Sequence, residues 1–307
     1  MAVLATSNLT IPKDIADGIV KDVQDGSAVA TLSASSPFRF GETDIVTLNG
    51  RPKAEFVGEG ADKSSDTIEF GVVTARPRKA QVTLRFNEEV QWADEDYQLG
   101  VLAEVGQALG EAMTRALDLG VLHAVNPLTG ANLTGSPTYV GASTNVIDAT
   151  DDPEADIEAA FGSLVTAAAP VTPTGIALDP AYAFKLATSR YANDGRKKFP
   201  DMPLSPRQVG SFMGMSAAVG DTIAAAAEVT GGTGISAIVG DWNRGLRWGI
   251  AKSLPLEVIR FGDPDGQGDL KRKNQIALRV EAAYVWHVFT DKFALIKGDD
   301  SDEDSGN

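Results

Sequence analysis

Two stretches of the chain alternate apolar and polar residues, and one stretch repeats apolar residues every three or four positions. Residues 80–86 alternate strictly, and a longer alternation runs over residues 276–286. A period of two predicts half-buried strands, and at about 3.3 Å per residue the longer one could reach ~40 Å. Apolar residues at helical spacing between 102 and 123 predict an amphipathic helix that begins near Asp94 or Glu95. This helix would span ~45 Å at about 1.5 Å per residue, so we expect it to lie along the long strand.

The middle of the chain predicts two capped helices with a short strand between them. Asp152 precedes a proline, which is typical of a helix N-cap followed by the first turn. Four apolar residues are expected on the inner face of this helix: Ile157, Phe161, Leu164 and Val165. Residues 175–178 predict a strand, and Asp179 before another proline begins the next helix. Residues 191–200 are polar and are expected to form an exposed loop.

Residues 45–73 predict extended structure that has no surface of its own to pack against. A strand at residues 45–48 is expected to turn at an Asn-Gly pair into a second strand at residues 53–57. Residues 57–73 then form two extended arms around a tip of Gly, Ser, Asp and Lys. An isolated two-stranded ribbon is marginally stable in water, so another surface must cover it.

Composition indicates a globular chain and narrows its partners. The 307 residues are 43% hydrophobic, which is enough for a buried core. No apolar run approaches the ~20 residues that cross a bilayer, the N-terminus lacks a secretory pattern, and cysteine is absent. We therefore expect a chain that is made and kept in the cytosol, without disulfides. A net charge of −15 argues against sequence-specific binding of nucleic acid, and part of that charge lies in residues 298–307, an expected disordered acidic tail.

The chain lacks motifs for catalysis or metal binding. Its two histidines, His123 and His287, have no cysteine partners and fit packed or surface positions. The glycine-rich residues 230–234 lack the Lys-Ser/Thr ending of a phosphate-binding loop. Residues 263–269 begin like a calcium loop, but Asn274 stands where the bidentate Glu belongs, so a hairpin turn is expected. No cofactor or metal site is expected, and a structural role is favoured.

Three basic clusters lie at residues 76–79, 196–198 and 271–273. None of them has the interleaved aromatic residues that stack on nucleic-acid bases. Each cluster is therefore expected at an interface or on a solvated face.

The order of these segments resembles the major capsid protein of tailed bacteriophages, which has the Hong Kong 97-type (HK97-like) fold. The resemblance covers most of the chain and depends on the order of several segments, none of which is specific alone. In chain order they are Ala54-Glu-Phe-Val-Gly-Glu59, Ala80-Gln-Val-Thr-Leu-Arg-Phe86, Arg115-Ala-Leu-Asp-Leu-Gly120, Gly240-Asp-Trp242, Leu254-Pro-Leu-Glu-Val258, Asn274-Gln-Ile-Ala-Leu-Arg-Val-Glu281 and Asp291-Lys-Phe-Ala-Leu295.

The resemblance implies an α+β fold with an N-terminal arm, an extended β-hairpin loop, a peripheral domain with a long spine helix and long strands, and an axial α/β domain. The corresponding ranges are residues 1–40 for the arm, 41–78 for the extended loop, 79–150 with 261–297 for the peripheral domain, 151–260 for the axial domain and 298–307 for the tail. In that family the loop lies over a neighbouring subunit, which would supply the surface that the hairpin lacks. The expected contact residues are Phe56, Glu59, Lys63, Ile68 and Phe70.

The function that the resemblance implies is a virion shell, in which pentamers and hexamers of one chain close into an icosahedral container for double-stranded DNA. Ile11-Pro12 already looks like arm, so a scaffold, if one is used, would be a separate protein. A portal and a decoration protein are further candidate partners, no membrane is involved, and assembly would take place in the cytoplasm of the host bacterium. The alternative with the same fold is an encapsulin, a bacterial nanocompartment shell around a cargo enzyme.

Some relatives join their subunits by an isopeptide bond between a loop lysine and an asparagine, helped by a glutamate. Lys63, Asn274 and Glu281 occupy plausible positions for such a crosslink. The reaction would need a neutral amine that attacks the amide, with the carboxylate taking up its proton in a partly dry pocket. The simpler interpretation is a surface lysine and two strand residues, which leaves the chain without enzymatic activity.

Overall fold

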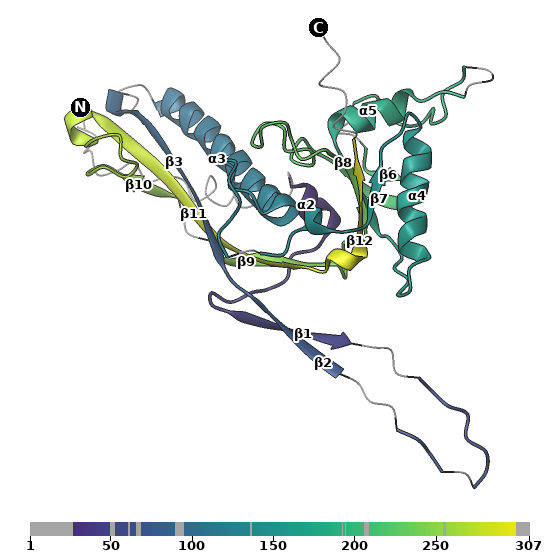
Figure 1. Cartoon of the computed structure of the whole chain (residues 1–307). Coiled ribbons are helices and arrows are strands. Elements are labelled where there is room, and N and C mark those ends of the chain that lie inside the picture. Colours follow the sequence, from purple (N-terminus) through teal and green to yellow (C-terminus); the bar gives the residue numbers. More distant parts are fainter. Residues whose placement is uncertain are drawn as a thin grey trace.

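A computed structural model describes residues 27–49, 53–60, 62–65, 69–89, 95–135, 137–191, 193, 195–205, 209–253 and 256–298. Two β-sheets, a long helix and a projecting two-stranded ribbon dominate this part of the chain (Figure 1). Residues 1–26 of the predicted arm, the predicted tail from residue 299 and the predicted contact residue Ile68 lie outside the described residues.

The first sheet is built around β11 (Gln275–Val288), which has paired strands along both edges. β3 (Arg78–Asn87) lies antiparallel on one edge, and β10 (Glu257–Ile259) and then β9 (Leu246–Ser253) lie antiparallel on the other. α3 (Glu95–His123) runs along this sheet and contacts both β3 and β11 (Figure 1). Alternate residues of β11 enter the main core, as the period of two predicts. The predicted long helix and long strand are confirmed, and they lie side by side.

The second sheet has six strands in the order β4-β12-β8-β5-β7-β6. These strands are β4 (Val146–Asp148), β5 (Gly175–Leu178), β6 (Ser211–Phe212), β7 (Met215–Val219), β8 (Ile235–Gly240) and β12 (Phe293–Lys297). Two helices pack on one face of this sheet, α4 (Pro153–Val165) and α5 (Pro180–Thr188). Short 3₁₀ helices connect elements elsewhere, among them η2 (Val140–Ala142), η4 (Lys271–Lys273) and η5 (Thr290–Lys292). The sheet therefore divides the protein into two apolar clusters, one on each face.

The capped helices form where the sequence predicts them. Asp152 accepts from the amide of Glu154 at the start of α4, and Asp179 accepts from the amide of Ala181 at the start of α5. The strand between them, β5, has the predicted bounds. The predicted inner face of α4 is only half correct, because Ile157 and Leu164 are buried whereas Phe161 and Val165 are 36% and 40% exposed. The buried stripe turns toward Ala160 instead, since this small residue lets the helix approach β12 closely.

The last part of the predicted N-terminal arm belongs to the folded body. α2 (Ala28–Leu32) is a short helix that Ser27 caps by accepting from the amide of Ala30. Its apolar side chains, including Val29 and Leu32, are buried in the main core. Residues three apart lie on one helical face, so this segment is embedded where the sequence predicts only a surface contact.

The ribbon consists of β1 (Thr43–Asn49) and β2 (Glu69–Ala75), and it projects away from both sheets (Figure 1). The predicted strand at residues 53–57 is wrong, because these residues have no regular secondary structure. β1 pairs directly with β2, in a register that brings Asn49 opposite Glu69. Residues 53–57 thus have extended character in their sequence but no strand beside them to complete a hydrogen-bonded ladder.

The predicted division into an axial range, 151–260, and a peripheral range, 261–297, stays a prediction. Strand pairing crosses the boundary between the two ranges. β9 and β10 lie in the sheet of β11, whereas β12 lies in the six-stranded sheet. Hydrogen bonding between strands therefore groups the chain by sheet, and no single cut near residue 260 reproduces that grouping.

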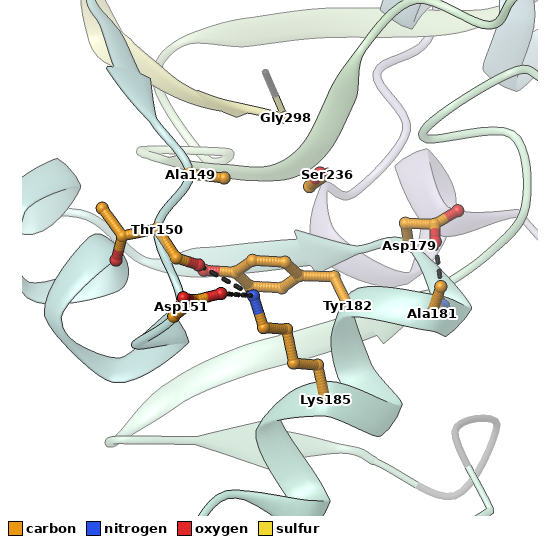
Figure 2. A pocket seen from close by; sticks show the side chains of 9 residues that line it. All are labelled: Ala149, Thr150, Asp151, Asp179, Ala181, Tyr182, Lys185, Ser236 and Gly298. Carbon is orange, nitrogen blue, oxygen red and sulfur yellow. Dashed lines mark hydrogen bonds and ion pairs between the residues drawn. The ribbon is translucent and has the colours of Figure 1, made fainter. Parts of the chain in front are cut away.

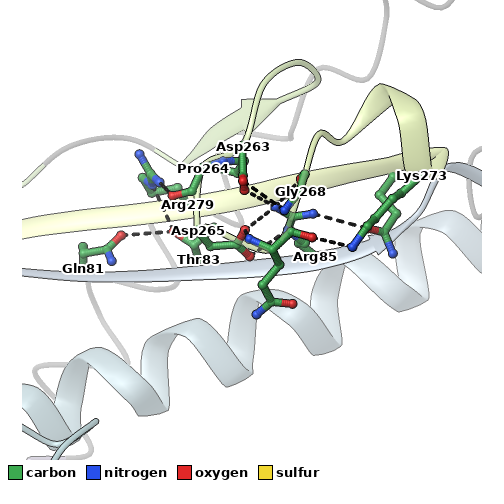
Figure 3. A network of polar contacts seen from close by, with 11 residues as sticks. Gln81, Thr83, Arg85, Asp263, Pro264, Asp265, Gly268, Lys273 and Arg279 are labelled. Carbon is green, nitrogen blue, oxygen red and sulfur yellow. Dashed lines mark hydrogen bonds and ion pairs between the residues drawn. The ribbon is translucent and has the colours of Figure 1, made fainter.

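The predicted turn at residues 263–269 connects β10 to β11 and closes around Arg85 of β3 (Figure 3). Arg85 Nε donates to Asp265 Oδ2 (2.7 Å), and Arg85 Nη2 donates to Asp263 Oδ1 (2.8 Å) and to the carbonyl of Gly268 (2.8 Å). The guanidinium is mostly covered by these partners, with its side chain 9% exposed. The carboxylates that resemble calcium ligands in the sequence thus bind a guanidinium group from a neighbouring strand.

Arg85 makes the stability of this sheet depend on pH. Its hydrogen bond holds the pKa of Asp265 below the usual value of 3.8. A carboxyl whose pKa is lowered by folding stabilises the protein above its usual pKa, and that contribution disappears as the pH falls through the lowered value. We therefore expect Arg85→Met to lower the urea midpoint near neutral pH, and the gap from the natural chain to close below about pH 4.

Arg247→Met is the matched control, because Arg247 lies exposed on β9 of the same sheet. It should leave the urea midpoint nearly unchanged at every pH. A gap between Arg85→Met and the natural chain that stays constant down to acid pH would show that Arg85 acts through packing of its alkyl chain instead.

Candidate assembly surface

One face of the ribbon is apolar and open to solvent. Val46 pairs with Val72 across the two strands, so their side chains point to the same face. Phe70 lies two residues before Val72 and shares that face. Val46, Phe70 and Val72 are 64%, 69% and 61% exposed. Three large apolar side chains in one row, on an element that projects into solvent, are typical of a surface that another molecule covers.

Polar contacts close the ribbon at its base. Thr74 Oγ1 donates to Asp44 Oδ1 (2.7 Å), and Arg76 pairs with Glu42 (3.0 Å between Nε and Oε1). Exposed contacts of this kind contribute little to stability, so they fix the register of the strands more than they hold the ribbon together. These polar contacts lie at the base, and the exposed row of Val46, Phe70 and Val72 lies further along the ribbon.

The described residues of the loop beyond the ribbon, 53–60 and 62–65, form no helix or strand. Ser64 donates its amide to Glu55 Oε1 (2.6 Å), and hydrogen bonding with Ser64 lowers the pKa of Glu55. Phe56 is fully exposed, and Glu59 and Lys63 are exposed as well. A fully exposed phenylalanine in a segment without a strand ladder has no folding role within its own subunit.

The role of the predicted residues in a contact between subunits stays a prediction, and the structure adds exposed apolar residues beside them. Phe56, Glu59, Lys63 and Phe70 all lie exposed on the ribbon or its loop. Val46 and Val72 were not predicted as contact residues. Their alternation with neighbouring residues is visible in the sequence, but only the register between β1 and β2 shows which residues share a face.

The residues of the hypothetical crosslink are far apart within one subunit. Lys63 lies in the loop beyond the ribbon, and Asn274 lies at the connection between β10 and β11, at the opposite end of the molecule (Figure 1). Asn274 directly precedes β11, and Glu281 is roughly 20 Å further along it at about 3.3 Å per residue. A site containing all three side chains would need contributions from different subunits.

Two of these side chains already have partners within the subunit. Asn274 Nδ2 donates to Glu89 Oε1 (2.9 Å). Glu281 pairs with Lys79 (2.7 Å), and the Glu281 side chain is 16% exposed. Glu281 would therefore have to give up its ion pair with Lys79 before it could contact a lysine of another subunit.

A polar pocket of about 640 Å³ lies beside α5 and the end of β12 (Figure 2). Lys185 Nζ donates to the carbonyl of Thr150 (2.8 Å) and lies 3.7 Å from Asp151 Oδ1. Tyr182 Oη donates to the carbonyl of Pro153 (3.1 Å), and burial raises the pKa of this phenol. The side chains around the pocket serve helix capping and local ion pairing, and none of those that line it forms a pair of nucleophile and base.

The histidines are packed side chains. His123 and His287 are both buried, and burial lowers the pKa of each. The described part of the chain contains no group of three His, Cys, Asp or Glu side chains that could hold a metal ion. None of its helices is both long enough and apolar enough to span a membrane. The ribbon and its loop are therefore the feature that most needs a partner.

Comparisons with known proteins agree with this architecture. The model of the phage capsid family matches residues 7–295. A solved structure from Mycobacterium phage Ogopogo is 43% identical, with a TM-score of 0.78 over 89% of this chain and 92% of that one. A structure from Gordonia phage Cozz is 32% identical, with a TM-score of 0.74 over 89% and 86% of the two chains.

A more distant structure has the same fold at low identity. The capsid of an empty GTA particle is 12% identical, with a TM-score of 0.61 over 89% of each chain. No curated protein matches the chain by sequence. The match to the family model spans nearly the whole chain and agrees with the helix and strand order described above. The chain belongs to the phage capsid family: it has the HK97-like fold and is a major capsid protein that forms a virion shell.

Proposed function

We propose that the apolar face of the ribbon and its loop bind a neighbouring subunit of the shell. The observation that supports this most directly is the row of Val46, Phe70 and Val72, which is exposed in one subunit. Burial of one large apolar side chain contributes about 1.5–3 kcal/mol. Since the contact repeats at every subunit, three such side chains per subunit are a substantial part of the free energy that closes a shell.

We further propose that the subunits form pentamers and hexamers of an icosahedral shell that encloses double-stranded DNA. The family match supports a shell, and it disfavours the encapsulin alternative. A heterologous contact, in which the ribbon of one copy lies on a different surface of the next, generates a closed ring when the rotation between copies closes. Assembly in the host cytoplasm, with a portal and with separate scaffolding or decoration proteins, is part of the same proposal.

A related proposal assigns one sheet to the peripheral part of the subunit and the other sheet to its axial part. The four-stranded sheet with α3 would form the peripheral part, residues 79–150 and 261–297, to which β9 and β10 add by strand pairing. The six-stranded sheet would form the axial part, residues 151–260, to which β12 adds. Exposed Phe161 and Val165 on α4 support a contact of the axial part with another subunit.

The double variant Val46→Thr and Val72→Thr tests the apolar face. Threonine keeps the β-branched shape that suits a strand, so the ribbon should form, but its hydroxyl makes burial of the face costly. We expect normal circular dichroism and a strong loss of closed shells, measured by electron microscopy and sedimentation. Val73→Thr is the control, because Val73 points to the opposite face of β2. Equal losses in both variants would contradict a contact through one face.

Replacement of residues 58–67 by a short Gly-Ser turn tests the loop. The body should fold normally, because the described residues of this segment are exposed. We expect closed particles to disappear or to become fragile, since Phe56 and Phe70 would lose the geometry that brings them to a neighbour. A loss of soluble, folded subunit would show that the loop folds back on its own body, and unchanged shells would show that it makes no important contact.

Denaturing gels test whether the shell is covalently linked. We expect mature shells to give a single band at the subunit mass, because Asn274 and Glu281 have partners within their own subunit. A ladder of higher bands that Lys63→Ala abolishes would establish the crosslink. Lys53→Ala is the control, because Lys53 is another exposed lysine of the same loop.

A further inference from the structure

The N-terminal strap, defined as residues 27–38, crosses the body close to both sheets without adding a strand to either. It includes α2, which contacts α3, β5 and β7 (Figure 1). Further along, the indole N–H of Trp248 on β9 donates to the carbonyl of Ser33 (3.0 Å). The backbone carbonyl of Trp248 accepts from the amide of Ser36 (2.7 Å). The strap is therefore attached near α3 at one end and at β9 at the other.

Asp118 of α3 holds the first residues of the strap. Its carboxylate is 2% exposed and accepts from the amides of Ala28 (3.0 Å) and Val29 (3.3 Å) and from the hydroxyl of Ser27. Thr222 Oγ1 donates to the same carboxylate (3.2 Å). Burial raises the pKa of Asp118, and these donors oppose the rise. Because a buried carboxylate is costly unless its oxygens accept hydrogen bonds, Asp118 favours the docked strap.

The strap lies in a slot between α3 and the loop after β7, which includes Thr222. Contacts that do not involve the strap hold this loop against α3. Arg115 of α3 pairs with Asp221 Oδ2 (2.8 Å), and His123 Nε2 donates to the carbonyl of Thr222 (2.9 Å). Both contacts join α3 to the loop that follows β7. Thr222 therefore stays beside Asp118 when the strap is absent, and the slot is preformed.

Two glycines leave room for the strap. A Cβ atom at Gly249 of β9 would lie 2.0 Å from the carbonyl oxygen of Ser36, and its three nearest atoms all belong to Ser36 and Phe38. A Cβ atom at Gly175 would lie 2.9 Å from Trp242 Cδ1 and 3.0 Å from Leu32 Cδ2, so this glycine makes room for the body as well as for the strap. Strand residues ordinarily carry a Cβ atom, so β9 itself would accept alanine at position 249. The strap is what requires glycine there.

We propose that the strap is a separate docking element, which leaves and re-enters its slot as a unit while α3 and both sheets stay folded, and that Asp118 is the positioning residue that selects the docked state. The strap is not a strand of either sheet, so the strand pairs within both sheets stay intact when it leaves, and β9 loses only its hydrogen bonds to Ser33 and Ser36. This role of Asp118 goes beyond the contact of the ribbon with a neighbour and does not depend on it.

Hydrogen exchange on the full-length chain before assembly tests the proposal directly. The amides of Ala30, Thr31 and Ser33 are hydrogen-bonded within the strap. We expect them to exchange together, at least about ten-fold faster than the amides of β11 that pair with β3. Exchange of the strap and β11 at one common rate would overturn the proposal, because the strap would then open only with global unfolding.

Gly249→Ala supplies an independent test. The added methyl group should displace the strap, speed exchange of its amides by a further factor of about ten and leave β11 protected. Gly162→Ala is the control, because a Cβ atom at this position of α4 meets nothing within 4 Å. Failure of Gly249→Ala to fold, or an unchanged strap, would overturn the proposal.

Asp118→Asn tests the hydrogen bonds that hold the strap, separately from the room that Gly249 leaves for it. The amide group retains the size of the carboxylate but has only one acceptor oxygen, so it cannot satisfy all of the donors that converge on it. We expect faster exchange of the strap with unchanged protection of β11. Loss of protection across β11 in this variant would show that Asp118 supports the whole core and is not a latch.

Discussion

The pairing of β11 along both edges is the constraint on which the rest of the structure depends. β3 lies on one edge, and β10 and β9 follow one another on the other, so segments far apart in the sequence meet on one strand. The face that β11 turns toward α3 carries alternating apolar side chains. These pairings bury the backbone polar groups of the strand and leave it no free edge over most of its length. α3 then has one surface on which to lie, which fixes its direction relative to the six-stranded sheet.

Each face of the six-stranded sheet packs against a different apolar cluster. Ala177 and Ile238 contribute to the main core with α2 and α3, whereas Ile176 and Val239 contribute to the cluster under α4 and α5. Adjacent residues of one strand thus belong to different cores, as the alternation of a strand requires. A strand buried on both faces is apolar at nearly every position, and β8 shows this pattern. The sheet is the wall that both halves of the body share.

The sequence is informative wherever a periodic pattern or a cap determines the element. Asp152, Asp179 and the alternation from Ile276 to Trp286 predict α4, α5 and β11 with nearly correct bounds. The sequence is misleading where the formation of a strand depends on a pairing partner. Residues 53–57 are extended in character, but they have no strand beside them. The strap and the apolar face of the ribbon were missed for the same reason, because register and burial by distant segments leave no local signal. The family resemblance predicts that the loop contacts a neighbouring subunit, whereas Val46 and Val72 are placed beside it only by the register of β1 and β2.

The contact proposed for the exposed row on the ribbon would also affect how the shell responds to temperature. Its apolar area stays in contact with water while the subunit folds, so the heat-capacity change linked to its burial belongs to assembly and not to folding. Apolar burial near room temperature is driven by the entropy of water and weakens on cooling. Contacts between subunits should therefore loosen in the cold while each subunit remains folded. A shell held partly in this way would come apart in the cold before its subunits unfold.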